Sequence, residues 1–148
     1  MFERLKSLFT NSNQPPEIPE SVWALTVLLN PDAKRKLTPD ETVAYALRNA
    51  DDLGERTHTL YYDGLESRQK VALYSSQDDA CLYVKFLSER RERSDAESDV
   101  TTFGMVLLRR ELLYERLRSA PNLRIVLDAG LPEERQLDLD ELRRYVKD

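Results

Sequence analysis

The sequence predicts an α+β fold, or a related α/β fold, with a small mixed sheet of three to five strands flanked by helices and a helical N-terminal portion. Two observations support this fold class. Thr38-Pro39-Asp40-Glu41 has the capping-box pattern that starts a helix. Residues that favour strands dominate later segments, among them 58–62, 70–75 and 100–108. At 148 residues the chain is long enough to bury one core.

The first 19 residues are predicted to lie outside the globular domain, which we expect over residues 20–148. Phe2, Leu5 and Phe9 recur at helical spacing, and three prolines follow between residues 10 and 20. This pattern predicts a short amphipathic helix and a proline-rich linker. Because isolated helices below about 12–15 residues are marginal in water, the helix must dock on its own domain, on a partner or on a membrane surface.

Two helices are predicted at the start of the domain. The first covers residues 20–29, opens at Pro19-Glu20-Ser21, and ends at Asn30-Pro31, because the residue before a proline disfavours the helical conformation. The second begins at the capping box and runs to about Asp52. One face of this second helix is apolar, with Val43, Ala46, Leu47 and Ala50.

A β-hairpin and a third helix are predicted next. The strands 58–62 and 70–75 flank a turn that begins at Asp63-Gly64, which is typical of a hairpin. Ser76 is then expected to cap a helix that reaches about Glu89. A strand is the alternative for this segment, since apolar residues also alternate there, at Ala80, Leu82, Val84 and Phe86.

The remaining elements alternate between strand and helix. Residues 89–99 carry charges of both signs and no large apolar side chain, which predicts a solvated loop or frayed helix end. The elements expected after this segment are strands at 100–108 and 123–128, a helix at 110–119, a turn at 129–132 and a closing helix from 138. Asp138 and Glu141 are predicted to form a second capping box there. The chain has no internal repeat.

The scarcity of certain residue types excludes several kinds of active site. The chain has one histidine (His58), one cysteine (Cys81) and four glycines, in none of the spacings that mark phosphate-binding loops or nucleophile elbows. We therefore expect His58 to be an ordinary surface or sheet-edge residue. Cys81 is expected to behave as a small apolar residue, with Asp78 and Asp79 disfavouring its thiolate. We expect no catalytic residue, no cofactor and no metal site.

The charged residues also have ordinary explanations. Two of the carboxylate pairs that lie close in sequence, Asp78/Asp79 and Asp138/Asp140, fall at predicted helix N-termini, which favour negative charge. Arginine and lysine cluster around positions 34–36, 90–93, 109–118 and 143–144, always with acidic neighbours. Surface ion pairing is the simplest interpretation. With a net charge of −5, binding to nucleic acid through these clusters and tyrosines is a less favoured alternative.

The second half of the chain resembles a known bacterial family. The residues that carry the resemblance are the strand Val71–Tyr74 ending in Ser75-Ser76, the strand Met105–Leu108 leading into a helix with Leu112 and Leu113, the strand Ile125–Leu127 ending in Asp128-Ala129-Gly130-Leu131-Pro132, and the closing stretch Leu137–Leu142. Over residues 70–146 this order is similar to the N-terminal domain of the SseB family, the enhanced serine sensitivity proteins. Asp128 stands where that pattern usually has asparagine. The resemblance implies a small α/β domain of cytoplasmic bacterial proteins with no established catalytic activity.

The sequence thus predicts a non-catalytic, cytoplasmic protein-interaction or accessory module, for which an inhibitor of the immunity type is one form. A single cysteine favours a reducing compartment, and no apolar stretch approaches the roughly 20 residues that span a bilayer. The predicted partner contacts are Phe2, Leu5, Phe9, Tyr61 and Tyr62. The partner is an unknown protein, and homo-oligomers are compatible with the sequence. A carboxylate-based enzyme is the second alternative.

Overall fold

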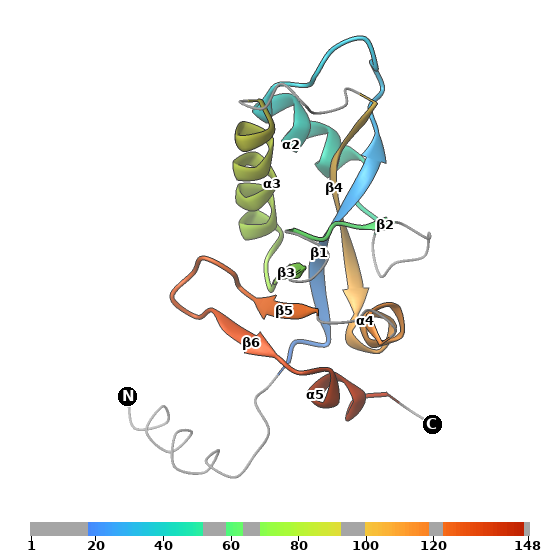
Figure 1. Cartoon of the computed structure of the whole chain (residues 1–148), viewed down its shortest axis with the longest axis vertical. Coiled ribbons are helices and arrows are strands. Elements are labelled where there is room, and N and C mark those ends of the chain that lie inside the picture. Colours follow the sequence, from blue (N-terminus) through green and yellow to red (C-terminus); the bar gives the residue numbers. More distant parts are fainter. Residues whose placement is uncertain (1–17, 52–58, 64–68, 93–99, 119–122, 147–148) are drawn as a thin grey trace.

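The computed structural model of the chain describes residues 18–51, 59–63, 69–92, 100–118 and 123–146 (Figure 1). In chain order its elements are β1 (Ser21–Leu29), α2 (Pro39–Arg48), β2 (Thr59–Leu60), β3 (Lys70–Tyr74), α3 (Gln77–Glu92), β4 (Thr101–Arg109), α4 (Arg110–Leu117), β5 (Arg124–Leu127), β6 (Arg135–Leu137) and α5 (Leu139–Arg143). The α+β class is confirmed. The sheet has six strands rather than the three to five expected.

Strand β1 is the centre of the sheet. One of its edges pairs along its whole length with antiparallel β4, from Ser21 opposite Arg109 to Leu29 opposite Thr101. The other edge is shared, because β3 pairs near Trp23 and β2 pairs near Thr26, both antiparallel. Beyond β3 the sheet continues through parallel β5 to antiparallel β6. Figure 1 shows that the sheet twists strongly, so that the long β1–β4 ribbon crosses the direction of β5 and β6.

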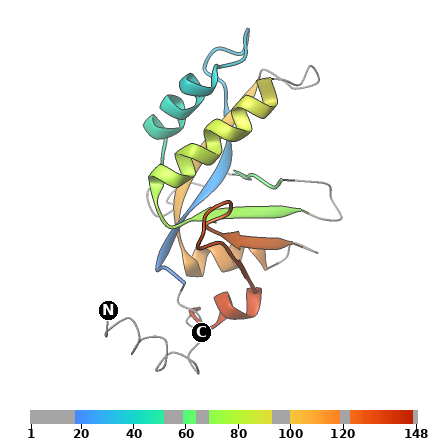
Figure 2. The ribbon, with the colours of Figure 1, turned by 90° about the vertical axis from the view of Figure 1, so that its left-hand side faces the viewer.

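The two faces of the sheet carry separate cores. Alternate residues of β1 divide between them, with Val22 and Ala24 in one core and Trp23 and Leu25 in the other. Helices α4 and α5 cover the first core, and α2 and α3 cover the second. Figure 2 shows α2 and α3 side by side on one side of the sheet.

The helix predicted over residues 20–29 is wrong, because this segment forms strand β1. Five consecutive residues, Val22–Thr26, are buried. A strand buried on both faces has no alternation of polar and apolar residues, so its sequence pattern resembles that of a short buried helix. The content of Val22, Trp23 and Thr26 favoured a strand.

The predicted hairpin of residues 58–62 and 70–75 is also wrong. Strand β2 pairs with β1, and its continuation meets β3 only at a single bridge between Asp63 and Lys70. That bridge has both backbone hydrogen bonds, at 2.9 and 2.8 Å. Strand β6 was not foreseen, since three residues of mixed polarity (Arg135–Leu137) give no recognisable strand pattern.

The remaining elements within the described ranges agree with the prediction, and the predicted N-terminal helix lies outside those ranges. The capping box at Thr38 and Glu41 forms as expected, and α3 is a helix rather than the alternative strand. The second capping box forms only in part: the Asp138 side chain accepts from Asp140 N at 2.9 Å, whereas the Glu141 carboxylate accepts from Arg135.

Ile18 is buried in the core beside α4. The proposed boundary between residues 19 and 20 remains a prediction.

Candidate functional site

Helix α3 combines a firmly anchored inner face with an exposed apolar outer face. Its N-terminus is fixed by Ser76, whose hydroxyl oxygen accepts from Asp79 N at 3.2 Å and whose hydroxyl donates to the Asp79 carboxylate at 2.8 Å. Three inner residues, Ala80, Val84 and Leu87, are at most 1% exposed. The helix is thus held rigidly against the sheet by its cap and by core packing.

The outer face of α3 carries two large apolar residues that nothing in the described structure covers. Leu82 is 63% exposed and Phe86 is 54% exposed. They lie four residues apart, and Asp78 precedes Leu82 by four residues while Arg90 follows Phe86 by four. Residues at this spacing line up along one row of a helix surface. We call Asp78, Leu82, Phe86 and Arg90 the α3 ridge.

Aromatic and cationic contacts fix the position of Phe86. Its ring stacks on Tyr83, with centroids 6.2 Å apart and planes 12° apart. The guanidinium carbon of Arg90 lies 5.8 Å from the Phe86 centroid, on the next turn of the helix. Tyr83 in turn contacts Tyr74 of β3, with centroids 5.5 Å apart. Phe86 is therefore solvent-exposed yet constrained by its neighbours.

Asp63, at the end of the β2 segment, ties the ridge to the sheet. Its carboxylate accepts from Arg90 Nη2 at 2.9 Å, from the Tyr83 hydroxyl at 3.3 Å and from the Tyr61 hydroxyl at 3.5 Å. Burial raises the pKa of Tyr83 and of Tyr61 above the ordinary value of 10, and the negative charge of Asp63 raises each pKa further. Both tyrosines therefore stay neutral and remain hydrogen-bond donors at physiological pH.

The predicted contact residues Tyr61 and Tyr62 do not form one surface. Tyr61 packs into the core under α2 and α3, where its ring meets Phe103 edge to face at a centroid distance of 5.0 Å. Tyr62 packs against the core on the opposite face of the sheet. Successive residues of an extended segment point to opposite faces, which explains the separation. The other predicted contacts, Phe2, Leu5 and Phe9, lie outside the described residues.

The ridge residues were not singled out from the sequence, although a signal for them existed. The alternating residues Ala80, Leu82, Val84 and Phe86 supported the strand alternative. In a helix, Ala80 and Val84 share one face and Leu82 and Phe86 share another. Choosing the helix therefore implied that one of these pairs would be exposed.

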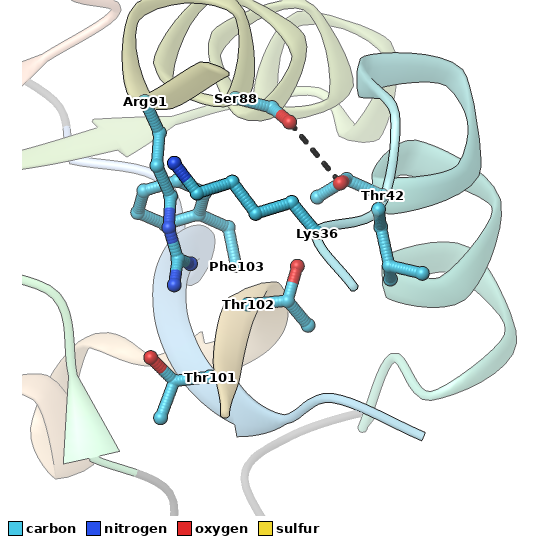
Figure 3. Close-up of a pocket in the computed structure, with 8 residues that line it drawn as sticks. Lys36, Thr42, Ser88, Arg91, Thr101, Thr102 and Phe103 are labelled. Carbon is cyan, nitrogen blue, oxygen red and sulfur yellow. Dashed lines mark hydrogen bonds between the residues drawn. The ribbon is translucent and has the colours of Figure 1, made fainter. Parts of the chain in front are cut away.

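A small cleft lies where the C-terminal half of α3 meets α2 and β4 (Figure 3). Its volume is about 10 Å³, which is room for a single water molecule. Ser88 donates to the Thr42 hydroxyl at 3.1 Å across it, and Thr42 donates to the Thr38 carbonyl at 2.9 Å. Arg91 lies over the ring of Phe103, with its guanidinium carbon 5.8 Å from the centroid. The cleft is a small gap where α2, α3 and β4 pack together, and it is too small for an organic substrate.

A wider and more open groove of about 500 Å³ lies at the other end of the molecule, lined by Ile18, Pro19, Arg110 and Tyr145. The Arg110 guanidinium carbon is 3.8 Å from the Tyr145 ring centroid. Arg110 Nη1 also donates to the Ile18 carbonyl at 2.9 Å. These contacts join the start of β1 to α4 and to the end of α5. Neither this groove nor the small cleft is lined by a carboxylate from the described residues.

The sequence also drew attention to Cys81, to His58 and to the chance of a metal site. Cys81 is partly buried, and burial followed by the charge of Asp78 raises the pKa of its thiol, as expected from the sequence. His58 lies outside the described residues. In the described ranges, no three residues of the His, Cys, Asp and Glu types are grouped so that they could hold a metal ion.

Arginines from three of the four basic clusters pair with acidic residues in the described structure. Arg35 binds Glu41 at 2.7 Å and lies 3.6 Å from Asp32. Similar pairs join Arg90 to Asp63 and Arg118 to Glu115. These pairs agree with the interpretation of the clusters as charged surface rather than as one continuous basic face.

Neither a search for membrane-spanning helices nor comparison with known proteins adds evidence about the function of this chain. Within the described ranges, no helix has both the length and the apolar character needed to cross a membrane. The chain has no significant match among models of protein families, among curated proteins or among solved structures.

Proposed function

We propose that this protein is a non-catalytic, cytoplasmic protein-interaction module that binds its partner through the α3 ridge. The observation that carries the proposal is the exposure of Leu82 and Phe86, 63% and 54%, on one row of a helix whose opposite face is fixed in the core. Water contact at two large apolar side chains is unfavourable by about 25 cal/mol per Å² of apolar surface. A partner that covers them removes this cost.

The composition of the ridge supports binding. Aromatic residues and arginine are enriched among the residues that contribute most to protein–protein affinity. Phe86 is held between Tyr83 and Arg90 before any partner arrives. A side chain that is already ordered loses little conformational entropy on binding, so more of the contact energy appears as affinity.

The charges at the ends of the ridge define the chemistry of the partner. Asp78 is exposed at one end and Arg90 is half-exposed at the other. The complementary surface is apolar at its centre, with a basic group opposite Asp78 and an acidic group opposite Arg90. The resemblance to the SseB family supports the same class of function, because it implies no established catalysis. The single cysteine supports a reducing compartment.

Site-specific photo-crosslinking tests the proposal. A photoreactive side chain is placed at position 82 in the full chain, or at position 47 as the control, since Leu47 is a leucine exposed on α2. We expect position 82 to give a defined protein adduct, identified by mass spectrometry, that excess unlabelled chain abolishes and excess Phe86→Ser chain does not. Equal adducts at positions 47 and 82, or none at position 82, would overturn the proposal.

A further inference from the structure

We infer that a second copy of this chain fits the α3 ridge, with the two α3 helices antiparallel about a two-fold axis that passes between Leu82 and Phe86. The inference rests on the proposed function and names its partner. An isologous contact of this kind requires a self-complementary surface, since each residue on one copy must suit the residue opposite it on the other. The α3 ridge meets this requirement in both its apolar and its charged residues.

The even spacing of the four ridge residues makes the ridge complementary to a second copy that runs in the opposite direction. Asp78, Leu82, Phe86 and Arg90 are each four residues apart and span about 18 Å of helix. Reversing the direction of the ridge places Leu82 against Phe86 of the other copy and Asp78 against its Arg90.

The charged ends have the capacity to pair. The bond from Arg90 to Asp63 is donated by Nη2, and the guanidinium has five N–H donors and is half-exposed, so it can also pair with a carboxylate of another copy. Asp78 is exposed and accepts no hydrogen bond from the described residues. Two-fold symmetry forms the Asp78–Arg90 pair twice, once at each end of the apolar centre.

The surroundings of the ridge favour the antiparallel direction. Asp78 and Asp79 lie in the first turn of α3, and Arg90 and Arg91 lie in the last turn. A parallel arrangement would bring like charges together, which is unfavourable, and would also align the two helix dipoles. On the flank next to α2, Lys85 already pairs with Asp40 at 3.5 Å. With two apolar residues from each copy, the contact is at the small end of interface sizes, so we expect a dissociation constant on the order of 10–100 μM.

Sedimentation velocity of the full chain measures this association. From about 1 μM to about 1 mM, we expect a concentration-dependent shift from monomer to dimer. Phe86→Ser should raise the dissociation constant at least about tenfold, because Phe86 lies at the centre of the contact. Leu47→Ser, which changes an exposed leucine away from the ridge, should leave the constant unchanged. Equal effects of both substitutions would overturn the inference.

Charge reversal tests the antiparallel arrangement directly. Asp78→Arg alone places two arginines at each end of the dimer, and Arg90→Asp alone places two aspartates there. We expect each variant to associate more weakly than the wild type, and an equimolar mixture of the two to associate more strongly than either variant alone. Circular dichroism checks that each variant is folded, which matters for Arg90→Asp because it also loses the bond to Asp63. A mixture that associates no better than its components would overturn the arrangement.

The crosslinking experiment separates failure of this inference from failure of the proposed function. A chain that stays monomeric at about 1 mM, yet crosslinks from position 82 to a different protein, overturns the dimer and leaves the function in place. A monomeric chain that gives no adduct at position 82 overturns both.

Discussion

At the residue scale, Thr26 is a buried polar residue whose hydroxyl makes no hydrogen bond in the described structure. Thr26 is 1% exposed in β1, and its hydroxyl has no hydrogen-bond partner among the described residues. It packs over Gly104, the residue opposite it in β4, where an added Cβ would lie 2.8 Å from Thr26 Oγ1. Together with the Leu28 side chain, which lies closer still, Thr26 fills the space above Gly104 that a Cβ would need.

Replacing this hydroxyl with a methyl group should leave stability unchanged or increase it. We expect Thr26→Val to stabilise the fold by up to about 1 kcal/mol, because no hydrogen bond is lost. Thr42→Val is the matched control and should destabilise by about 1–2 kcal/mol, since the Thr42 hydroxyl bonds both Ser88 and the Thr38 carbonyl. Urea unfolding measures both variants. Equal destabilisation by the two would contradict this account.

Asp128 is a second residue whose identity follows from backbone geometry. Its φ of 55° lies in the left-handed region, which asparagine and aspartate tolerate better than most residues. Its carboxylate accepts from Ser75 N and from Ser75 Oγ, both at 3.0 Å, and so connects the ends of β3 and β5. Asparagine tolerates the same backbone conformation, can accept from Ser75 N through Oδ1 and can donate to Ser75 Oγ through its amide nitrogen.

Aspartate and asparagine should therefore be interchangeable at position 128. We expect Asp128→Asn to change the free energy of unfolding by less than about 0.5 kcal/mol. Asp128→Ala should cost about 2 kcal/mol, through lost hydrogen bonds and backbone strain. Thermal or urea unfolding decides the point, and a large cost for both substitutions would mean that the carboxylate charge itself is required.

At the element scale, the elements predicted correctly are those specified by local chemistry. Helix α2 follows from Thr38 and Glu41, which bond each other's backbone, and α3 follows from the Ser76 cap. The partners of β1 and β2 depend on contacts distant in sequence. Thr59 pairs with Val27 rather than with the nearby β3, and local sequence does not encode that choice. Predicting the exposed α3 ridge from the sequence requires treating this segment as a helix, because a helix separates Leu82 and Phe86 from Ala80 and Val84.

The capping box of α2 also predicts a pH dependence. Hydrogen bonds from the Arg35 side chain and then from Thr38 N lower the pKa of Glu41 from its ordinary 4.5 to about 2. A carboxyl whose pKa is depressed in the folded state stabilises the fold above its unfolded pKa, and this contribution is lost as the pH falls through the folded value. The loss should therefore occur between about pH 4.5 and pH 2.

Glu41→Gln isolates this contribution, because glutamine does not titrate. We expect the wild type to be more stable than the variant above about pH 4.5, and the difference to shrink towards zero near pH 2. Urea midpoints of both proteins across this range give the difference, from which the effects of all other carboxylates cancel. A difference that is constant with pH would show that Glu41 acts only through its shape.

At the scale of the whole molecule, both faces of the sheet are already covered by helices. Helices α2 and α3 shield one core and α4 and α5 shield the other, so the sheet faces are not free to bind a partner. Among the described residues, this leaves the outer surfaces of the helices and the sheet edges for a protein contact. Among those surfaces, α3 combines high apolar exposure with fixed aromatic side chains.

The most direct measurement of the role of the α3 ridge is a dilution series observed through leucine methyl groups by NMR. The account predicts that, on dilution from about 1 mM, the Leu82 methyl signals shift, whereas those of the exposed Leu47 and Leu29 do not. Phe86→Ser should move the shift of Leu82 to higher concentration and reduce its size. Leu82 signals that stay constant throughout, or that shift no more than those of Leu47 and Leu29, would contradict self-association through the α3 ridge.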